Sequence, residues 1–346
     1  MIRDRVAATA NLLRLHTAGF EGFIFTAGPM IEGIAVPLGD LVVLWIIGVL
    51  VNGYIFALND LVDLSRDRLN PAKSRSPLVT GALSERAALL WSLGLPLIAV
   101  AITVLHEWNV GAQVLFVLLL LLGAVVNLYQ KVTTHPLVMD LLFALAMAAP
   151  LIVTAWAVVG SAGPVVWSAT ALLFVLSLQL NSVAGNLKDL ASDRRTGFRT
   201  VAIAMGADIA VDGGLLATSL YRRYCWVLYA LAVSVGVVTL WLATRGAPLT
   251  VVVGCVTVVV VAVVAVVAGA VSLRRMLGGQ RRPSPRGREI YFAAGFLMLL
   301  LVVVVRAPWL SLVPTVTGLV FWEAMFTLYW GWYWRSSRSV AHAGTA

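Results

Sequence analysis

Cysteine and charged residues are scarce in this 346-residue chain, and each shortage excludes a class of protein. The two cysteines, Cys225 and Cys255, both lie inside apolar runs, so we expect neither a disulfide framework nor a cysteine-based metal site. Only 12% of the residues are charged, whereas 60% are hydrophobic, and the mean hydropathy is +0.93. A water-soluble domain of this composition would expose far more apolar surface than water tolerates. The sequence therefore predicts an integral membrane protein.

Long apolar runs are what the chain has in abundance. A membrane-spanning helix needs about 20 apolar residues, and ten candidate runs lie near residues 17–37, 41–58, 86–105, 111–128, 137–160, 165–185, 223–244, 247–272, 289–306 and 309–333. The first and last runs are the least regular, because they contain acidic residues that are costly in hydrocarbon. We therefore predict nine or ten spans. The expected fold class is all-α, a polytopic transmembrane helix bundle that forms one domain over residues 1–346.

Basic residues are distributed unevenly between the two sides that ten spans would define. Of the 25 Lys and Arg residues, all except Arg245 and Arg306 fall on the side of the N-terminus. An excess of Lys and Arg marks the cytoplasmic side, so we expect these loops in the cytoplasm, with the protein in a prokaryotic plasma membrane. The net charge of +9 then reflects topology and contact with anionic lipids. We expect no nucleic-acid partner and no obligate protein partner.

Two clusters of acidic and amide residues each close an apolar run on that same side. The first has the sequence NDLVDLSRD and the second NLKDLASD. Their oxygen-bearing side chains are Asn59, Asp60, Asp63 and Asp67 in the first cluster, and Asn186, Asp189 and Asp193 in the second. On a continuing helix, each set would fall within an arc of about 100°. Each cluster is therefore expected to present hard oxygen ligands on one side.

Carboxylates that are brought together repel one another unless cations or protons relieve the repulsion. Oxygen donors without His or Cys favour Mg²⁺ over zinc, and Mg²⁺ typically joins a few carboxylates to the phosphates of a substrate. The bases that stand near the acids are Lys73, Arg75, Lys131, Arg194, Arg195 and Arg199. Such a mixture suits a metal–diphosphate complex. The alternative interpretation is that acids and bases at helix ends simply pair with each other at the water interface.

The two clusters also carry a resemblance to a known family. NDLVDLSRDRLNPAKSRSPLVTGALS resembles the N-D-x-x-D-x-x-x-D motif and the following basic segment of the UbiA superfamily of intramembrane prenyltransferases. NLKDLASDRRTGFRTVAIAMG is similar to their second D-x-x-x-D motif with its G-x-R-T tail, and LYQKVTTHPLVMD between them resembles a family loop that bears Tyr and Lys. The resemblance extends from the first span to about residue 206. One departure is Asn186, which stands where the longer form of the second motif begins with aspartate.

The resemblance implies a helical bundle around a central cavity open to lipid, capped by cytoplasmic loops that carry both motifs. It implies that Mg²⁺, and through it the diphosphate of a prenyl donor, is held by Asn59, Asp63, Asp67, Asp189 and Asp193, with Asp60 a further candidate ligand. It assigns contact with the diphosphate or the ionising allylic carbon to Arg75, Tyr129 and Lys131. Lys73, Asn186 and Arg199 are further candidates for binding the substrate.

Three functional classes remain open at this point. The leading one is transfer of a prenyl group to a lipophilic, aromatic acceptor. A terpene cyclase of the same superfamily would ionise the same donor and close the chain on itself without an acceptor. A transporter could use intramembrane acids for ion coupling, but such sites lie near the bilayer midplane, and these clusters lie at its edge.

Isolated polar residues within the apolar runs are costly and need a reason. Asp140, near a predicted helix start, suits either helix capping or acceptor contact. The C-terminal run FWEAMFTLYWGWYWRSSR is typical of an interfacial aromatic belt.

Overall fold

The computed structural model describes residues 2–70, 73–130, 133–210, 214–245, 249–278 and 285–343. They group into two compact units. The first unit comprises Met1–Thr26, Val36–Glu107 and Trp309–Ala346, and the second comprises Ala27–Ala35 and Trp108–Pro308. Each unit is assembled from segments that are distant in the sequence. The expectation of a single domain over the whole chain stays a prediction.

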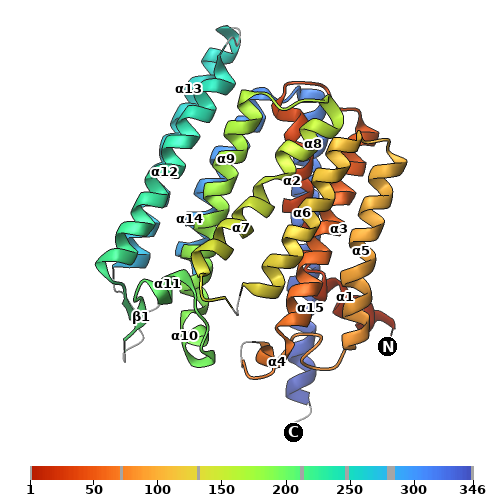
Figure 1. Cartoon of the computed structure of the whole chain (residues 1–346), viewed down its shortest axis with the longest axis vertical. Coiled ribbons are helices and arrows are strands. Elements are labelled where there is room, and N and C mark those ends of the chain that lie inside the picture. Colours follow the sequence, from red (N-terminus) through yellow and green to blue (C-terminus); the bar gives the residue numbers. More distant parts are fainter. Residues whose placement is uncertain are drawn as a thin grey trace. The chain divides into compact units, whose positions relative to one another are not determined.

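The first unit is built around one long helix, α3. Its helices are α1 (Ile2–Leu12), the first part of α2 (Ala18–Ile31), α3 (Leu38–Val62), α4 (Leu64–Asp67), α5 (Glu85–Leu105) and α15 (Trp309–Ala343). Helix α3 packs against α1, α5 and α15 (Figure 1). Gly48 allows α2 to approach closely, because a Cβ at this position would lie 2.7 Å from the carbonyl oxygen of Glu21. Close backbone approach therefore fixes α2 on α3.

The second unit is built around α9. Its elements are the rest of α2, α6 (Val110–Tyr129), α7 (Pro136–Ala148), α8 (Pro150–Val159), α9 (Pro164–Gln179), η2 (Leu180–Gly185), α10 (Asn186–Thr196), α11 (Val201–Ala204), β1 (Asp208–Ile209), β2 (Leu215–Leu216), α12 (Ser219–Thr244), α13 (Leu249–Leu277) and α14 (Pro285–Arg306). Helix α9 packs against α7, α8, α12 and α14. Within this unit, α10, α11 and β1 gather at one end of α9 and α12 (Figure 1).

Helix starts in both units carry ordinary local signals. The side chains of Ser84, Asn109 and Thr218 accept hydrogen bonds from backbone N–H groups of α5, α6 and α12, respectively. Helices α7, α8 and α9 each begin with proline, whose missing N–H costs nothing at the first helical position. Pro150 also separates α7 from α8. Proline has no N–H to donate to the preceding helical turn, and its ring clashes with that turn.

The membrane helices agree with the prediction of an all-α bundle. In the described part of the chain, eight helices are long and apolar enough to cross a membrane, and α14 contributes a shorter apolar segment, Ala293–Arg306. The apolar run predicted first contains α2, whose 14 residues span about 21 Å against the roughly 30 Å of a hydrocarbon core. A small antiparallel hairpin, with Ile209 opposite Leu215, was not predicted from the sequence.

Trp322 shows that the C-terminal aromatic run also serves internal packing. Its indole Nε1 donates a hydrogen bond of 2.7 Å to the carbonyl of Leu15, and its ring lies 6.2 Å from that of Trp45. Trp322 thus ties α15 to the segment between α1 and α2. The interfacial belt stays a prediction for the rest of the run.

Candidate functional site

The first acid cluster lies where α3 ends. Helix α3 ends at Val62, and after Asp63 the chain continues into the single turn of α4. The N–H of Asp63 donates to the carbonyl of Asn59 at 3.0 Å, and the N–H of Asp67 donates to the carbonyl of Asp63 at 2.9 Å. The four-residue hydrogen-bond spacing that the sequence predicts therefore continues across the junction between the two helices.

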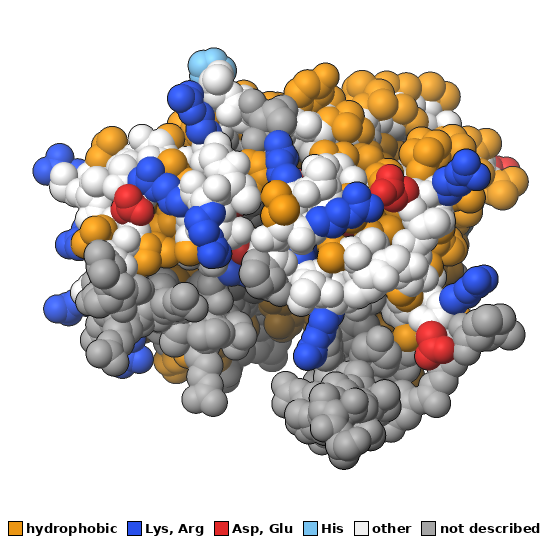
Figure 2. All heavy atoms as spheres, turned by 90° about the horizontal axis from the view of Figure 1, so that it is seen from below, with side chains coloured by type: hydrophobic (Ala, Val, Ile, Leu, Met, Phe, Trp, Pro, Cys, Tyr) orange, Lys and Arg blue, Asp and Glu red, His pale blue; other side chains and the backbone are white. Residues whose placement is uncertain are grey.

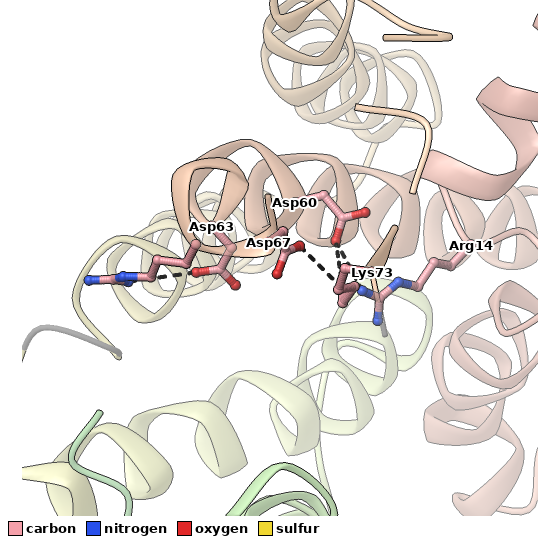
Figure 3. A network of polar contacts seen from close by, with 6 residues as sticks. Arg14, Asp60, Asp63, Asp67 and Lys73 are labelled. Carbon is pink, nitrogen blue, oxygen red and sulfur yellow. Dashed lines mark hydrogen bonds and ion pairs between the residues drawn. The ribbon is translucent and has the colours of Figure 1, made fainter. Parts of the chain in front are cut away.

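Three carboxylates of this cluster are buried, and Lys73 joins two of them. Asp60, Asp63 and Asp67 are 5%, 3% and 8% exposed, and Asn59 is half-buried. The Lys73 ammonium lies 3.8 Å from Oδ1 of Asp60 and 3.4 Å from Oδ2 of Asp67 (Figure 3). Buried carboxylates need such compensation, because an unpaired charge in a low dielectric is strongly destabilising.

Two arginines complete the charge balance of the first cluster. Arg14 donates from Nη2 to Oδ1 of Asp60 at 3.0 Å, and its guanidinium lies 4.1 Å from the centre of the Phe56 ring. Arg66 approaches Asp63, with 3.9 Å between Nη1 and Oδ1. Sequence reasoning missed Arg14, because the only signal this residue gives is its positive charge before the first span.

His16 follows Arg14 closely and is half-buried. Burial, and secondarily the charge of Arg14, lowers the pKa of His16 from 6.5. The imidazole is therefore mainly neutral at pH 7 and adds little to the positive charge near Arg14.

The donor set of the first cluster fits Mg²⁺ only as part of a larger coordination sphere. Among the described residues, no group of three or more His, Cys, Asp or Glu side chains is arranged to hold a metal ion. Mg²⁺, however, is usually bound by one or two carboxylates together with water and substrate phosphates. Asp60, Asp63 and Asp67 supply oxygen donors of that kind, so the chemistry fits a shared metal site and does not fit an all-protein cage.

The second acid cluster lies on α10, directly after a π-helical segment. Helix α9 runs into η2, and α10 begins at Asn186. Asn186 is 7% exposed, and its Nδ2 has no hydrogen-bond partner within the part of the chain that the structure describes. Asp189 is exposed and Asp193 is half-buried. The two predicted metal ligands, Asp189 and Asp193, and the predicted substrate-binding residue Asn186 therefore differ in their access to solvent.

The sequence GFRT after the second cluster has a structural explanation for two of its residues. Gly197 ends α10 with φ +74°, a left-handed conformation in which a side chain would be strained. Thr200 begins α11, where its side chain accepts a hydrogen bond from the N–H of Ile203. Arg199, between them, is exposed. It is therefore the member of this segment that is available to a phosphate.

The remaining predicted residues lie at loop edges. Tyr129 is the last residue of α6 and is 55% exposed. Arg75 is exposed in the loop that follows Lys73. Lys131 lies outside the described residues. Arg194 donates a hydrogen bond of 3.0 Å to the carbonyl of Ala207, and its guanidinium lies 3.4 Å from the Asp208 carboxylate. Its side chain therefore already has partners within the second unit.

In the second unit, an open groove of about 460 Å³ lies between the β1–β2 hairpin and the start of α12. It is lined by residues of the hairpin and the start of α12, including Asp208, Thr218 and Arg222. None of the predicted site residues lines it, so the groove does not identify the substrate site.

Comparison with protein families identifies the family to which this chain is similar. The UbiA prenyltransferase family matches residues 23–276, which extends beyond both motifs and into α13. A search of curated proteins found no match.

Solved structures give the same fold at low sequence identity. A UbiA homolog from Aeropyrum pernix K1 superposes with a TM-score of 0.63 at 19% identity, over 84% of this chain and 98% of its own. A UbiA homolog from Archaeoglobus fulgidus, bound to DMAPP and Mg²⁺, gives a TM-score of 0.58 at 16% identity, over 84% of this chain and 99% of its own. A digeranylgeranylglyceryl phosphate synthase structure gives 0.58 at 15% identity, over 87% and 98%.

Proposed function

Because this chain belongs to the UbiA prenyltransferase family, we propose that it ionises an allylic prenyl diphosphate with the help of Mg²⁺ and transfers the prenyl group to a lipophilic, aromatic acceptor. The observation that carries the proposal is the first acid cluster, in which Asp60, Asp63 and Asp67 are buried beside cationic side chains. Oxygen donors for a metal and cations for phosphate are thus present at one helix end.

Ionisation breaks the bond between the allylic carbon and the diphosphate oxygen, and the electron pair leaves with the diphosphate. Mg²⁺, when bound, would neutralise charge on the leaving diphosphate. We assign metal binding to Asn59, Asp60, Asp63 and Asp67 from the first cluster and to Asp189 and Asp193 from the second. Asn186 would donate from its buried Nδ2 to a phosphate oxygen, as the amide lacks a partner among the described residues.

The cationic residues would bind the rest of the diphosphate. Lys73 lies beside two carboxylates that are assigned to the metal, and its ammonium would bind phosphate oxygens at the same helix end. Arg75, Arg199 and Lys131 are assigned the same role from their motif positions. Tyr129, at the end of α6, is assigned contact with the phosphate or the allylic cation.

The second half of the reaction needs an environment with little water. The allylic cation accepts an electron pair from the acceptor ring, a carbon–carbon bond forms, and the ring then loses a proton. Water would capture the same cation, so the helices must exclude it. The apolar spans supply that environment and admit a long isoprenoid chain from the lipid.

We further propose that both motifs face the cytoplasm of a prokaryotic cell. The asymmetry of Lys and Arg along the sequence supports this orientation. The face drawn in Figure 2 carries many Lys and Arg side chains and few acidic ones, as expected of a cytoplasmic surface.

The test is an assay of the purified protein in lipid with Mg²⁺ and prenyl diphosphates of several lengths, with and without aromatic acceptors. We expect acceptor-dependent release of diphosphate that stops with EDTA and resumes with added Mg²⁺. A cyclic hydrocarbon formed without acceptor would replace the transferase proposal by a terpene cyclase. No turnover with any donor would contradict both enzymatic functions.

A further inference from the structure

Within the second unit, the helix that leads into the second acid cluster is interrupted by a π-helical segment. Helix α9 ends at Gln179, η2 covers Leu180–Gly185, and α10 starts at Asn186. A π-turn inserts one extra residue, and each residue of a helix rotates the side-chain direction by about 100°. The direction in which Asn186, Asp189 and Asp193 project therefore depends on whether this segment is π- or α-helical.

Asp140 of α7 is bonded to two side chains of the π-segment. Asn181 donates from Nδ2 to Oδ1 of Asp140 at 2.9 Å, and Ser182 donates from Oγ to Oδ2 at 2.6 Å. Asp140 is 4% exposed and lies on a membrane helix. It does not cap that helix, whose N-cap residue is His135. Of the two roles that the sequence left open for Asp140, the structure excludes capping.

Helix α12 contacts the same segment from another side. Tyr221 donates from Oη to the carbonyl of Ser182 at 2.9 Å. Gln179, just before the segment, donates from Nε2 to the carbonyl of Leu228 at 2.8 Å. Tyr221, Ser182 and Gln179 are all buried. A π-turn changes the backbone hydrogen-bond pattern of a helix. Tyr221 bonds the backbone within the segment, and Gln179, the residue just before the segment, bonds to α12.

A carboxylate in a membrane helix is costly and needs a compensating role. The side chain of Gln130, which follows the last residue of α6, also hydrogen-bonds to Asp140. Both carboxylate oxygens of Asp140 accept hydrogen bonds from the π-segment, one from Asn181 and one from Ser182. Asp140 therefore joins α7 to the π-segment through both of its oxygens.

From this geometry we infer that Asp140 is a positioning residue, which acts through Asn181 and Ser182 to hold the π-turn that orients the second acid cluster toward the metal–diphosphate complex. The inference rests on the proposed function only for the identity of the ligand. The effect on the direction of α10 stands on the hydrogen bonds alone.

The orientation of α10 can be measured by thiol labelling, without any turnover. In a background of Cys225→Ala and Cys255→Ala, Lys188→Cys places a thiol at an exposed position, and Leu190→Cys places one at a position with 0% exposure. We expect a polar maleimide to label the first and spare the second. Adding Asp140→Leu should reduce labelling at 188 and raise it at 190 by several-fold.

Ser182→Ala is the second test variant, because it removes one hydroxyl and leaves the packing nearly unchanged. Asp140→Asn keeps one acceptor oxygen, so this variant should retain much of the native labelling pattern that Asp140→Leu loses. The matched control is Thr239→Val, which removes the 2.7 Å contact between Ser168 and Thr239 elsewhere on α9 and α12. This variant should label like the unaltered background.

The second readout is Mn²⁺ binding by electron paramagnetic resonance, with Mn²⁺ as a probe for Mg²⁺. We expect Asp140→Leu to weaken Mn²⁺ binding about 10-fold or more, as for other residues that orient metal ligands. Native labelling in both Asp140→Leu and Ser182→Ala would overturn the inference. A changed labelling pattern in a protein that shows no prenyl turnover would contradict the proposed function and leave this inference standing.

Discussion

The two acid clusters have similar sequences, yet the structure gives them different surroundings. In the first, Asp60, Asp63 and Asp67 are buried and three cationic side chains lie beside them. In the second, Asp189 is exposed and lies on a helix whose direction follows a π-turn. The positions of the acids in the first cluster therefore depend on charge balance, and those in the second depend on the direction of the helix backbone.

Each cluster is therefore expected to lose its function in a different way. Buried carboxylates keep their positions only while their charge is balanced, so the first cluster depends on Lys73, Arg14 and Arg66. An exposed aspartate needs no such balance, so the second cluster depends on α10 pointing in the right direction. Substitutions in the two clusters should accordingly produce distinct kinetic and thermodynamic signatures.

The largest expected effect is the loss of an acid from either cluster. Asp63→Ala and Asp189→Ala should each lower turnover by about 1000-fold, because each removes charge that would hold the metal–diphosphate complex. Diphosphate release measures the effect, and circular dichroism confirms that the helices remain. Asp40→Ala, at the opposite end of α3, is the control and should retain turnover. Full activity in both test variants would refute the metal assignment.

Lys73→Met should change metal and donor binding in opposite directions. The ammonium lies beside Asp60 and Asp67, the two carboxylates for which it would compete with a metal, so its removal should lower the Mg²⁺ concentration needed for half-maximal activity. Loss of a charged phosphate contact should raise KM for the donor about 10-fold. Arg68→Met removes the exposed ion pair with Glu85 and serves as the control, with little effect expected. If KM for the donor does not change, Lys73 is only a structural partner of the acids.

Arg14→Met should act mainly on stability. Figure 3 shows Asp60 in contact with Arg14 and Lys73, and without Arg14 the more distant Lys73 would be the cation left beside this buried carboxylate. We expect the loss to lower the free energy of unfolding by about 1–3 kcal/mol. Thermal unfolding in detergent measures this loss. The double variant with Asp60→Asn should be less destabilised than the sum of the single variants, because the two residues interact. Strict additivity would show that the pair contributes no coupling.

Gly197→Ala should have the smallest effect. A left-handed conformation costs a non-glycine residue roughly 1–2 kcal/mol, and no atom lies within 4 Å of the position that an added Cβ would occupy. We expect a small loss of stability and a modest rise in KM for the donor, measured by melting and kinetics. Gly94→Ala, in the middle of α5 with equally open space, should stabilise slightly instead. Equal effects at both positions would argue against a strained helix end.

Much of this fold could be predicted from local properties of the sequence, above all from the length of its apolar runs. Apolar runs near 20 residues predict spans, and the observed helices follow them because hydrocarbon requires every backbone group to be bonded within the helix. The first of the two least regular runs, residues 17–37, contains the short helix α2, consistent with the acidic residues in that run. The hairpin of β1 and β2 was missed, because two residues per strand give no alternation to detect.

Composition and residue spacing are enough to predict a helical membrane protein with two oxygen-rich motifs. Both properties are local, so they are the same for any arrangement of the spans. The pairing of Arg66 with Asp63 is local, at i,i+3 spacing, but the approach of Arg14 to the first cluster and the direction of the second motif depend on tertiary structure. Arg14 reaches Asp60 across 46 positions, and Asp140 reaches Ser182 across 42. Such contacts depend on which helices pack together, and no spacing along one helix can specify them.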